Sequence, residues 1–437
     1  MAKRGRSALL FILVWLFFPA AASAADYPGL KVVDYQTGQP ILNAKVTVNN
    51  EVLLADSQNL FPLTKAGGKV RIRAHGYQRI EQVLPASFPA SPYSVRLVPQ
   101  NPKALYLTFY GIGEKALREP ALKLIEETEL NALVIDVKGD RGWIPYKSSI
   151  PLAFEVGATK ITTVRDMPGL IKSLKERGIY TIARIVVFKD HPLATARPEW
   201  AVKTEGGEIW KDRESLAWVD PFRKEVWEYN IRIAVEAAQQ GFDEIQFDYV
   251  RFPDSSSPRF SRPSTEESRV KAVSGFLQEA YNALLPYNVF VAADIFGYVC
   301  WNYNDTNIGQ KLEALVPSVD YLSPMLYPSG YQFGIPGYRN PVANPYEIVY
   351  LSLKKAQERT NLPSTRFRPW LQSFRDYAFD RRVFNGKEIR EQISAADRFG
   401  SQGWMLWNPG NVYSSEALKV EKSPTWITSL ASVPERL

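Results

Sequence analysis

The stretch GFDEIQFDYVRFP, residues 241–253, has the pattern of a short buried strand that ends in polar and aromatic side chains. Ile245 and Phe247 fall on one face of an extended chain, and Gln246 and Asp248 fall on the other. In a sheet covered by helices the apolar face packs against the helices, so Gln246 and Asp248 should point to the opposite side. We therefore predict a strand at 244–249 that presents functional side chains at its end.

Seven further apolar runs flank this strand, and longer helical patterns separate them. The predicted strands are 104–109, 132–137, 180–188, 244–249, 289–295, 321–326, 366–373 and 403–407. The predicted helices are 115–129, 166–178, 222–240, 265–285, 307–316, 345–360 and 387–400. Strands alternating with helices in this way predict an α/β fold closed as a (β/α)8 TIM barrel. An open doubly wound sheet is the alternative, but no GxGxxG sequence follows any of these strands.

Residues 26–100 predict a separate, small all-β sandwich, with strands at 30–33, 44–48, 68–74 and 93–97. Residues 34–46 and 73–77 resemble the carboxypeptidase regulatory-like domains of secreted proteins, which implies a non-catalytic domain whose protein partner is unknown. His75 lies in this region, and we expect it to pack or to make a turn hydrogen bond. A linker at 99–102 then leads to the predicted barrel, 103–415, and a C-terminal tail, 416–437.

The first 24 residues have the three-part pattern of a secretory signal peptide. Basic residues precede an apolar run at 8–18, and Ala22-Ser23-Ala24 supplies the small residues of a cleavage site. A retained N-terminal anchor is the alternative. We therefore expect a secreted or periplasmic protein with no stable membrane insertion after cleavage.

Composition narrows the function classes further. The chain has 437 residues, 45% of them apolar, which excludes an intrinsically disordered protein. The one cysteine, Cys300, excludes a disulfide scaffold and a CxxC zinc site, and we expect it to be a buried free thiol. The formal charge of +7 falls by three without the signal sequence, and no cluster of Lys and Arg predicts nucleic-acid binding.

Carboxylates end three of the predicted strands, at Asp136, Asp248 and Asp294. The carboxyl ends of barrel strands carry the chemistry, so these are the candidate catalytic residues. Helix capping or ion pairing with Arg184 or Arg251 is the structural alternative. Capping is a weak explanation for Asp136 and Asp248 because long segments separate them from the next predicted helix.

Aromatic side chains crowd the same predicted rim. They are Trp143, Phe188, Tyr249, Trp301, Tyr327, Tyr331, Phe374 and Trp407. Rings that stack on sugars, above polar side chains that bind hydroxyls, predict a carbohydrate site, and glycosidic bonds are cleaved by two carboxyl groups. We expect sugar stacking on Trp301, Tyr327 and Trp407, and polar contacts from Arg184, Arg251, Gln372 and Asn408. No cofactor or metal is predicted, although Asp190 and His191 with Asp136 could form a small metal site in a different kind of enzyme.

The motif at 241–253 also carries a family resemblance. Together with 131–139, 293–298, 321–327 and 403–409 it is similar to a bacterial family of glycoside-hydrolase-like (β/α)8 barrels, over residues 103–415. The resemblance implies an exported glycoside hydrolase. By analogy with α-amylase-type barrels, Asp248 would be the nucleophile, and Asp294 stands where those barrels place a Glu as the acid. A non-catalytic glycan-binding barrel is the alternative.

Overall fold

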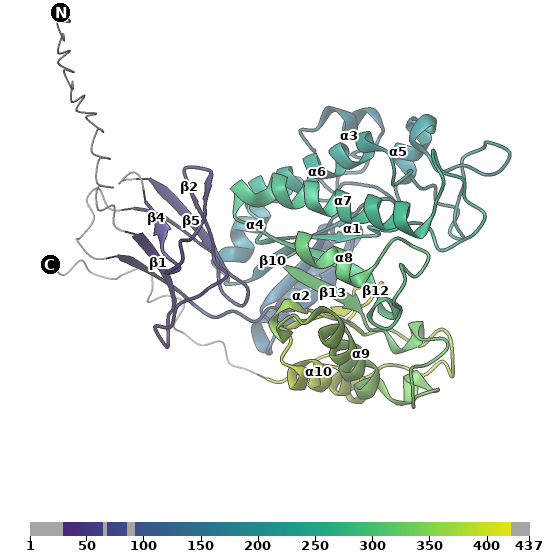
Figure 1. The fold of residues 1–437 in the computed structure, drawn as a ribbon. Coiled ribbons are helices and arrows are strands. Elements are labelled where there is room, and N and C mark those ends of the chain that lie inside the picture. Colours follow the sequence, from purple (N-terminus) through teal and green to yellow (C-terminus); the bar gives the residue numbers. More distant parts are fainter. Residues whose placement is uncertain (1–28, 64–67, 85–91, 421–437) are drawn as a thin grey trace, which may run out of the picture.

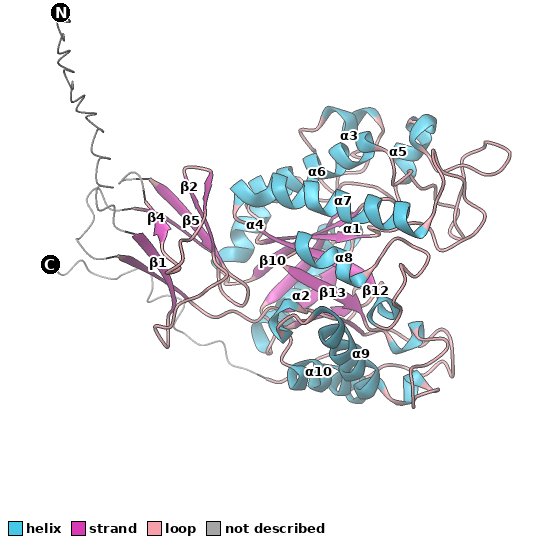
Figure 2. Cartoon of the chain, viewed as in Figure 1, coloured by secondary structure: helices cyan, strands magenta, loops and turns pink. Residues whose placement is uncertain are grey.

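The computed structural model describes residues 29–63, 68–84 and 92–420, which form a small β domain and a larger barrel (Figure 1). The predicted signal peptide and most of the predicted tail lie outside these residues. Figure 2 shows strands at the centre of the larger part, with helices around them. No helix among the described residues is both long enough and apolar enough to cross a membrane.

The larger part is a closed barrel of eight parallel strands, as predicted. The strands are β8 (Lys103–Leu107), β9 (Ala132–Lys138), β10 (Tyr180–Val186), β11 (Glu244–Asp248), β12 (Phe290–Phe296), β13 (Tyr321–Met325), β14 (Trp370–Gln372) and β15 (Trp404–Trp407). Each strand pairs with the next in the chain, and β15 pairs with β8 to close the barrel. All eight predicted strands are therefore confirmed, with β14 shorter than expected.

The helices that follow the strands are α2 (Lys115–Glu127), α4 (Met167–Glu176), α6 (Lys224–Gln239), α7 (Glu266–Leu284), α8 (Leu312–Leu315), α9 (Pro345–Thr360) and α10 (Gly386–Phe399). Short helices α1 (Phe109–Gly113), α3 (Pro151–Glu155) and α5 (His191–Ala196) were not predicted. The helix predicted at 307–316 shrinks to α8, because Thr306, Asn307 and Gly309 have positive φ values of 55°, 57° and 83° that no right-handed helix contains.

Local capping sets where the longer helices begin and end. Thr265 caps α7, with its Oγ1 accepting a hydrogen bond from the Ser268 N–H at 3.2 Å. Asn385 caps α10, and Gly400 ends it with a φ of 81°, which suits a residue without a side chain.

The alternation predicted for β11 is confirmed. Ile245 and Phe247 lie in the core between the barrel and its helices. Gln246 points into the barrel, where its Nε2 donates to Ser323 Oγ at 3.1 Å. Inside the barrel, small and aromatic residues such as Ala292 and Tyr106 fill the space, which makes the interior a packed core.

The β domain consists of two sheets packed on one apolar core, as expected for a sandwich. One sheet holds β1 (Gly29–Asp34), β4 (Phe61–Pro62) and β7 (Tyr93–Leu97). The other holds β2 (Lys45–Val48), β3 (Glu51–Leu53), β5 (Lys69–Arg73) and β6 (Ile80–Val83).

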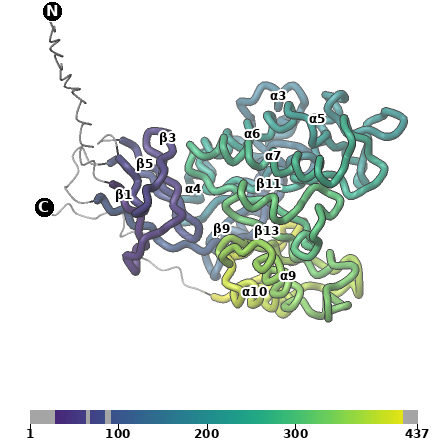
Figure 3. The backbone as a smooth tube through the Cα atoms, viewed as in Figure 1, coloured from purple at the N-terminus to yellow at the C-terminus, as the bar shows by residue number. Residues whose placement is uncertain are grey.

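Figure 3 shows the β domain beside the barrel. The hydrogen bonds between the two lie at the amino-terminal ends of barrel strands. Arg79 reaches Asp243, just before β11, through its Nε and Nη2 at 3.0 and 2.9 Å. His75 does more than the local packing we expected: its Nε2 lies 3.2 Å from Asp320 Oδ1, just before β13. Burial alone would raise the pKa of Asp320, but Arg73 and His75 bring it well below its usual range.

Candidate active site

A cavity of about 490 Å³ opens at the carboxyl ends of the barrel strands. It is lined by Arg184, Glu214, Asp248, Tyr249, Arg251, Phe296, Gly297, Tyr298, Met325, Tyr327, Gly330, Tyr331, Trp370, Phe374, Tyr377, Trp407 and Pro409. A larger depression of about 770 Å³ lies along the loop at 252–264, but no strand-end carboxylate lines it. The first cavity, which we call the main cavity, is therefore the candidate site.

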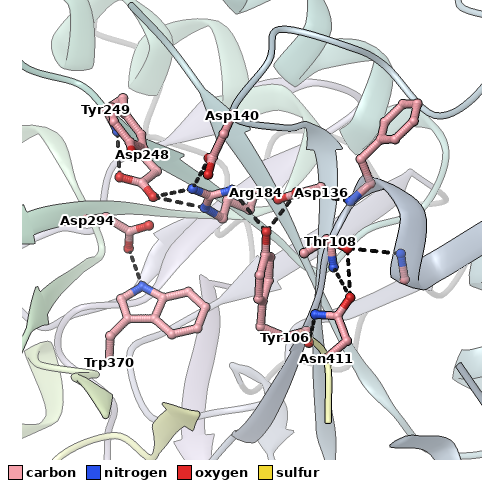
Figure 4. Close-up of polar contacts among 12 residues, drawn as sticks. Tyr106, Thr108, Asp136, Asp140, Arg184, Asp248, Tyr249, Asp294, Trp370 and Asn411 are labelled. Carbon is pink, nitrogen blue, oxygen red and sulfur yellow. Dashed lines mark hydrogen bonds and ion pairs between the residues drawn. The ribbon is translucent and has the colours of Figure 1, made fainter. Parts of the chain in front are cut away.

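Arg184 of β10 organises the acidic residues at the floor of the main cavity (Figure 4). Its Nε and Nη2 donate to Asp248 Oδ2 at 2.9 and 2.7 Å. Its Nη1 donates to Asp136 Oδ1 at 2.7 Å, and its Nη2 also donates to Asp140 Oδ1 at 2.7 Å. Strand register explains this arrangement, because Arg184 sits beside Asp136 on β9 and beside Gln246 on β11. One buried guanidinium thus holds three carboxylates.

Asp248 is the last residue of β11 and faces the main cavity. Its Oδ1 accepts a hydrogen bond from the Tyr249 N–H at 2.6 Å. The strand ends one residue before the predicted boundary because Tyr249 adopts a φ of 47°, an uncommon value for a residue with a side chain. The same backbone turn brings the Tyr249 ring to the cavity wall. If the strand had continued, its alternation would have placed this ring against the helices.

The Asp294 side chain lies in a different environment from that of Asp248. The register pairs Phe247 with Ala293, so the two aspartates that follow occupy neighbouring strands. Figure 4 shows both side chains on the same side of Arg184. Asp294 is buried, its Oδ1 accepts from Trp370 Nε1 at 2.7 Å, and its Oδ2 has no hydrogen-bond partner in the described structure. Burial and the charge of Asp248 raise the pKa of Asp294 well above its usual value, which favours a protonated carboxyl.

Asp136 is held more tightly than either of these residues. Its Oδ2 accepts from the Tyr106 hydroxyl at 2.8 Å and from the Phe109 N–H at 3.1 Å, while its Oδ1 accepts from Arg184. Burial raises the pKa of Asp136 even though Arg184 opposes that shift. Neither Asp136 nor Asp294 lines the main cavity, but both oxygens of Asp136 accept hydrogen bonds, whereas Asp294 Oδ2 has no described partner.

The predicted binding residues divide into two groups. Arg184, Arg251, Tyr327 and Trp407 line the main cavity. Arg251 also lies 5.1 Å from the Tyr249 ring centroid, and Arg184 lies 4.8 Å from that of Trp407.

Trp301, Gln372 and Asn408 are not among the lining residues. The Trp301 indole donates to Ser352 of α9 at 2.9 Å. Gln372 is buried against Ser329, and Asn408 Nδ2 donates to the Ser373 carbonyl at 2.6 Å. All three side chains are therefore bonded to other parts of the barrel.

The other aromatic residues predicted at the rim are found in three different places. Tyr331 and Phe374 line the main cavity, whereas Phe188 is fully buried against Phe276 of α7. Trp143 lines a separate, smaller cavity.

Sequence reasoning missed several residues of the main cavity. Glu214 comes from the loop between β10 and α6, where its Oε2 accepts from Lys189 Nζ at 2.9 Å. Phe296, Tyr298 and Tyr377 add aromatic surface. Phe296 and Tyr298 lie two and four residues after Asp294 and could have been found there, whereas nothing in the polar sequence around Glu214 points to the cavity.

The residues of the alternative metal site are separated by their contacts. Asp190 pairs with Lys138 at 2.7 Å and caps α5, and His191 Nδ1 accepts from the Ala217 N–H at 3.2 Å. In residues 29–63, 68–84 and 92–420, no three His, Cys, Asp or Glu side chains form a group that could hold a metal ion.

A parallel barrel with strand-end carboxylates and aromatic walls is an architecture of glycoside hydrolases. Sequence comparison agrees: residues 104–413 match the family described as "Putative glycosyl hydrolase domain", and the chain belongs to that family. A search of curated proteins found no match.

Among solved structures, a hypothetical protein from Ruminiclostridium thermocellum is 39% identical. That alignment covers 44% of this chain and 96% of the other, with a TM-score of 0.39. The glycoside hydrolase domain of PgaB (BpsB) from Bordetella bronchiseptica is 15% identical, with 72% and 95% coverage and a TM-score of 0.52. The glycoside hydrolase domain of PelA from Pseudomonas aeruginosa is 11% identical, with 71% and 96% coverage and a TM-score of 0.41. The PgaB match supports the barrel fold.

Proposed function

We propose that this protein hydrolyses glycosidic bonds of a poly- or oligosaccharide, with Asp248 and Asp294 as its catalytic carboxyl pair. The contrast between their surroundings carries the proposal. Asp248 receives two hydrogen bonds from Arg184, whereas Asp294 is buried, has a raised pKa and has no described partner for its Oδ2. Glycoside cleavage uses two carboxyl groups in unlike surroundings, one that donates a proton and one that attacks the sugar or activates water.

In this mechanism Asp294 protonates the leaving glycosidic oxygen, and Asp248 attacks the anomeric carbon or activates a water molecule. Arg184 orients Asp248 and keeps a positive charge beside it. Asp294 is one methylene shorter than a glutamate and does not line the main cavity. The leaving oxygen must therefore reach the floor of the main cavity, between Asp248 and Trp370, to meet the Asp294 proton.

Glu214 is the second candidate for the acid, because it lines the main cavity from a loop. Its side chain is mostly exposed and pairs with Lys189 at 2.9 Å. Glu214 Oε2 is thus engaged by the Lys189 ammonium, whereas Asp294 Oδ2 has no hydrogen-bond partner among the described residues. We therefore assign the acid role to Asp294, and a Glu214→Gln variant should keep most of the activity.

The walls of the main cavity suit sugar rings. Tyr327, Phe374 and Trp407 offer aromatic faces to the C–H surfaces of a sugar, and Arg251 offers hydrogen-bond donors to its oxygens. These residues support a carbohydrate substrate without selecting a particular sugar or linkage.

We also propose that the protein acts outside the cytoplasm, on the evidence of the signal-like pattern in the first 24 residues. The β domain would then be a non-catalytic companion, since it contacts the barrel at the end opposite the main cavity. Determination of the amino terminus of the protein recovered from the periplasmic and culture fractions of its native host tests this proposal. A start at residue 25 or 26 supports export with cleavage, an intact terminus supports the retained anchor, and absence from these fractions and from the outer face of the membrane contradicts export.

The hydrolase proposal is tested by reducing-sugar release from a panel of bacterial and plant polysaccharides. Asp248→Asn should lower release at least about a hundredfold, which is the scale of a lost catalytic carboxylate. Asp254→Asn is the matched control, because Asp254 is an exposed aspartate on the loop that follows β11. Release that survives Asp248→Asn would contradict the assignment, and binding without release would favour the glycan-binding barrel.

A further inference from the structure

A second cavity, of about 130 Å³, lies beyond the ends of β8 and β9. Its aromatic side chains are Tyr106, Phe109, Tyr110 and Trp143, and its carboxylates are Asp136 and Asp140. The volume is below the range of sites for drug-sized ligands, which is ~300–1,000 Å³, so it suits a single small unit. We call it the side cavity.

A wall of two stacked rings and one arginine separates the side cavity from the main cavity. Tyr106 lines the side cavity and Trp407 lines the main cavity, and their rings stack with centroids 4.0 Å apart. Arg184 contributes the rest of the wall, because it faces the main cavity while it binds Asp136 and Asp140 of the side cavity.

The two cavities also approach each other closely at their carboxylates. Arg184 Nη2 donates to both Asp140 Oδ1 and Asp248 Oδ2, at 2.7 Å each. The distance between Asp140 Oδ1 and Asp248 Oδ2 therefore cannot exceed the combined length of these two hydrogen bonds. This separation is on the scale of one sugar unit, so neighbouring units of one chain can reach both cavities.

The side cavity has the chemistry of a sugar site. The Tyr110 ring packs edge-on against Phe109 and Trp143, at centroid distances of 5.0 and 6.5 Å, and remains 51% exposed. The Asp140 side chain is 38% exposed and uses Oδ1 for Arg184, which leaves Oδ2 without a described donor. An accessible aromatic surface beside an open carboxylate oxygen can bind the C–H face and a hydroxyl of one sugar.

A glycine keeps this cavity open. A Cβ added at Gly139 would lie 3.0 Å from Asp136 Oδ2 and 3.4 Å from the Phe109 Cβ. A side chain there would fill the space between Asp136 and the aromatic cluster, so the absence of one at position 139 preserves the cavity.

We infer that the side cavity is a subsite for the same glycan whose scissile bond lies at Asp248, so that the bound chain extends across Arg184 from one cavity to the other. This inference rests on the proposed function. It makes the protein a hydrolase whose substrate is a chain of at least two sugar units, because a single sugar in the main cavity would leave the side cavity empty.

Calorimetric titration tests the subsite in an Asp248→Asn background, where bound chains are not consumed. The probes are β-1,4-linked glucose, β-1,4-linked N-acetylglucosamine and β-1,6-linked N-acetylglucosamine oligomers, from dimers to hexamers. Tyr110→Ala is added as the test variant. Tyr35→Ala is the matched control, because Tyr35 is 48% exposed in the β domain.

We expect affinity to increase with chain length and Tyr110→Ala to weaken binding of the longer oligomers roughly three- to tenfold, the scale of one aromatic contact. Dimers and the Tyr35→Ala control should show no such loss. Trp143→Ala, checked for folding by circular dichroism, should reproduce the effect. Equal affinities with and without Tyr110, or no binding by any oligomer series, would overturn the subsite. Turnover of polysaccharide by the wild-type protein tests the hydrolase proposal separately.

Discussion

Arg79 is expected to be the main polar anchor between the β domain and the barrel, and Arg79→Ala should destabilise the protein. The guanidinium donates to Asp243 Oδ1 at 3.0 and 2.9 Å. It also donates to the carbonyls of Gly241, Phe242 and Asn288, at 3.2, 2.9 and 3.3 Å. All of these acceptors belong to the barrel, so one substitution removes a whole set of interdomain contacts.

The expected loss in the free energy of unfolding depends on which partners Asp243 keeps after Arg79→Ala. Hydrogen bonds to charged groups contribute about 1.5–3 kcal/mol, and loss of one partner of a buried pair costs about 3–5 kcal/mol. Asp243 keeps Lys175 at 2.9 Å and the Thr181 N–H at 2.9 Å, so it does not become an unpaired charge. We therefore expect a loss of about 2–3 kcal/mol in the free energy of unfolding.

Urea-induced unfolding at pH 7 and pH 3 measures this loss. Burial alone would raise the pKa of Asp243, but Arg79 and Lys175 lower it below its value in the unfolded protein. The contribution of that carboxylate is therefore present above about pH 4 and decreases as the pH falls through the folded pKa. Arg79→Ala should cost less at pH 3 than at pH 7. The control is Arg96→Ala, whose guanidinium donates to the Tyr35 carbonyl of its own domain. An Arg79→Ala loss as small as that of the control would refute the reasoning.

Three further predictions concern buried groups. The raised pKa of Asp294 makes its ionisation unfavourable in the folded protein, so the wild-type protein should lose stability as the pH rises from 4 to 8. Asp294→Asn should reduce this loss, measured as Tm, and an unchanged pH dependence would contradict the buried environment of Asp294. Trp370→Phe should move the alkaline limb of the activity profile to higher pH, because it removes the hydrogen bond that favours ionised Asp294; a shift to lower pH would count against Asp294 as the acid. Burial raises the pKa of Cys300 to about 12, so its thiol should react with a thiol reagent only after unfolding; rapid labelling of the native protein would refute this.

The barrel could be predicted from sequence because its strands carry a local signal. Ile245 and Phe247 alternate with Gln246 and Asp248, and this two-residue period fixes which side chains enter the barrel. The position of Asp294 beside Asp248 then follows from strand order alone. Both aspartates could therefore be selected before the structure was known.

Residues outside the strands depend on backbone turns and distant contacts that no local pattern encodes. A 3-10 turn at Gly297–Cys300 follows β12 and directs the next residue, Trp301, toward Ser352 and away from the main cavity. Glu214 reaches the main cavity through a loop held by Lys189, and His75 reaches Asp320 in the other domain. These placements depend on tertiary packing between segments far apart in the chain.

The most direct test of the carboxyl pair compares two substrates in the Asp294→Asn variant. One is a polysaccharide hydrolysed by the wild-type protein, and the other is the 2,4-dinitrophenyl glycoside of the sugar released from it. Dinitrophenolate leaves without protonation, so loss of the acid should spare this substrate. We predict that Asp294→Asn lowers polysaccharide hydrolysis at least about a hundredfold while it retains most aryl-glycoside hydrolysis, and that Asp248→Asn loses both. Unchanged polysaccharide hydrolysis by Asp294→Asn, or equal losses on both substrates, would contradict the assignment.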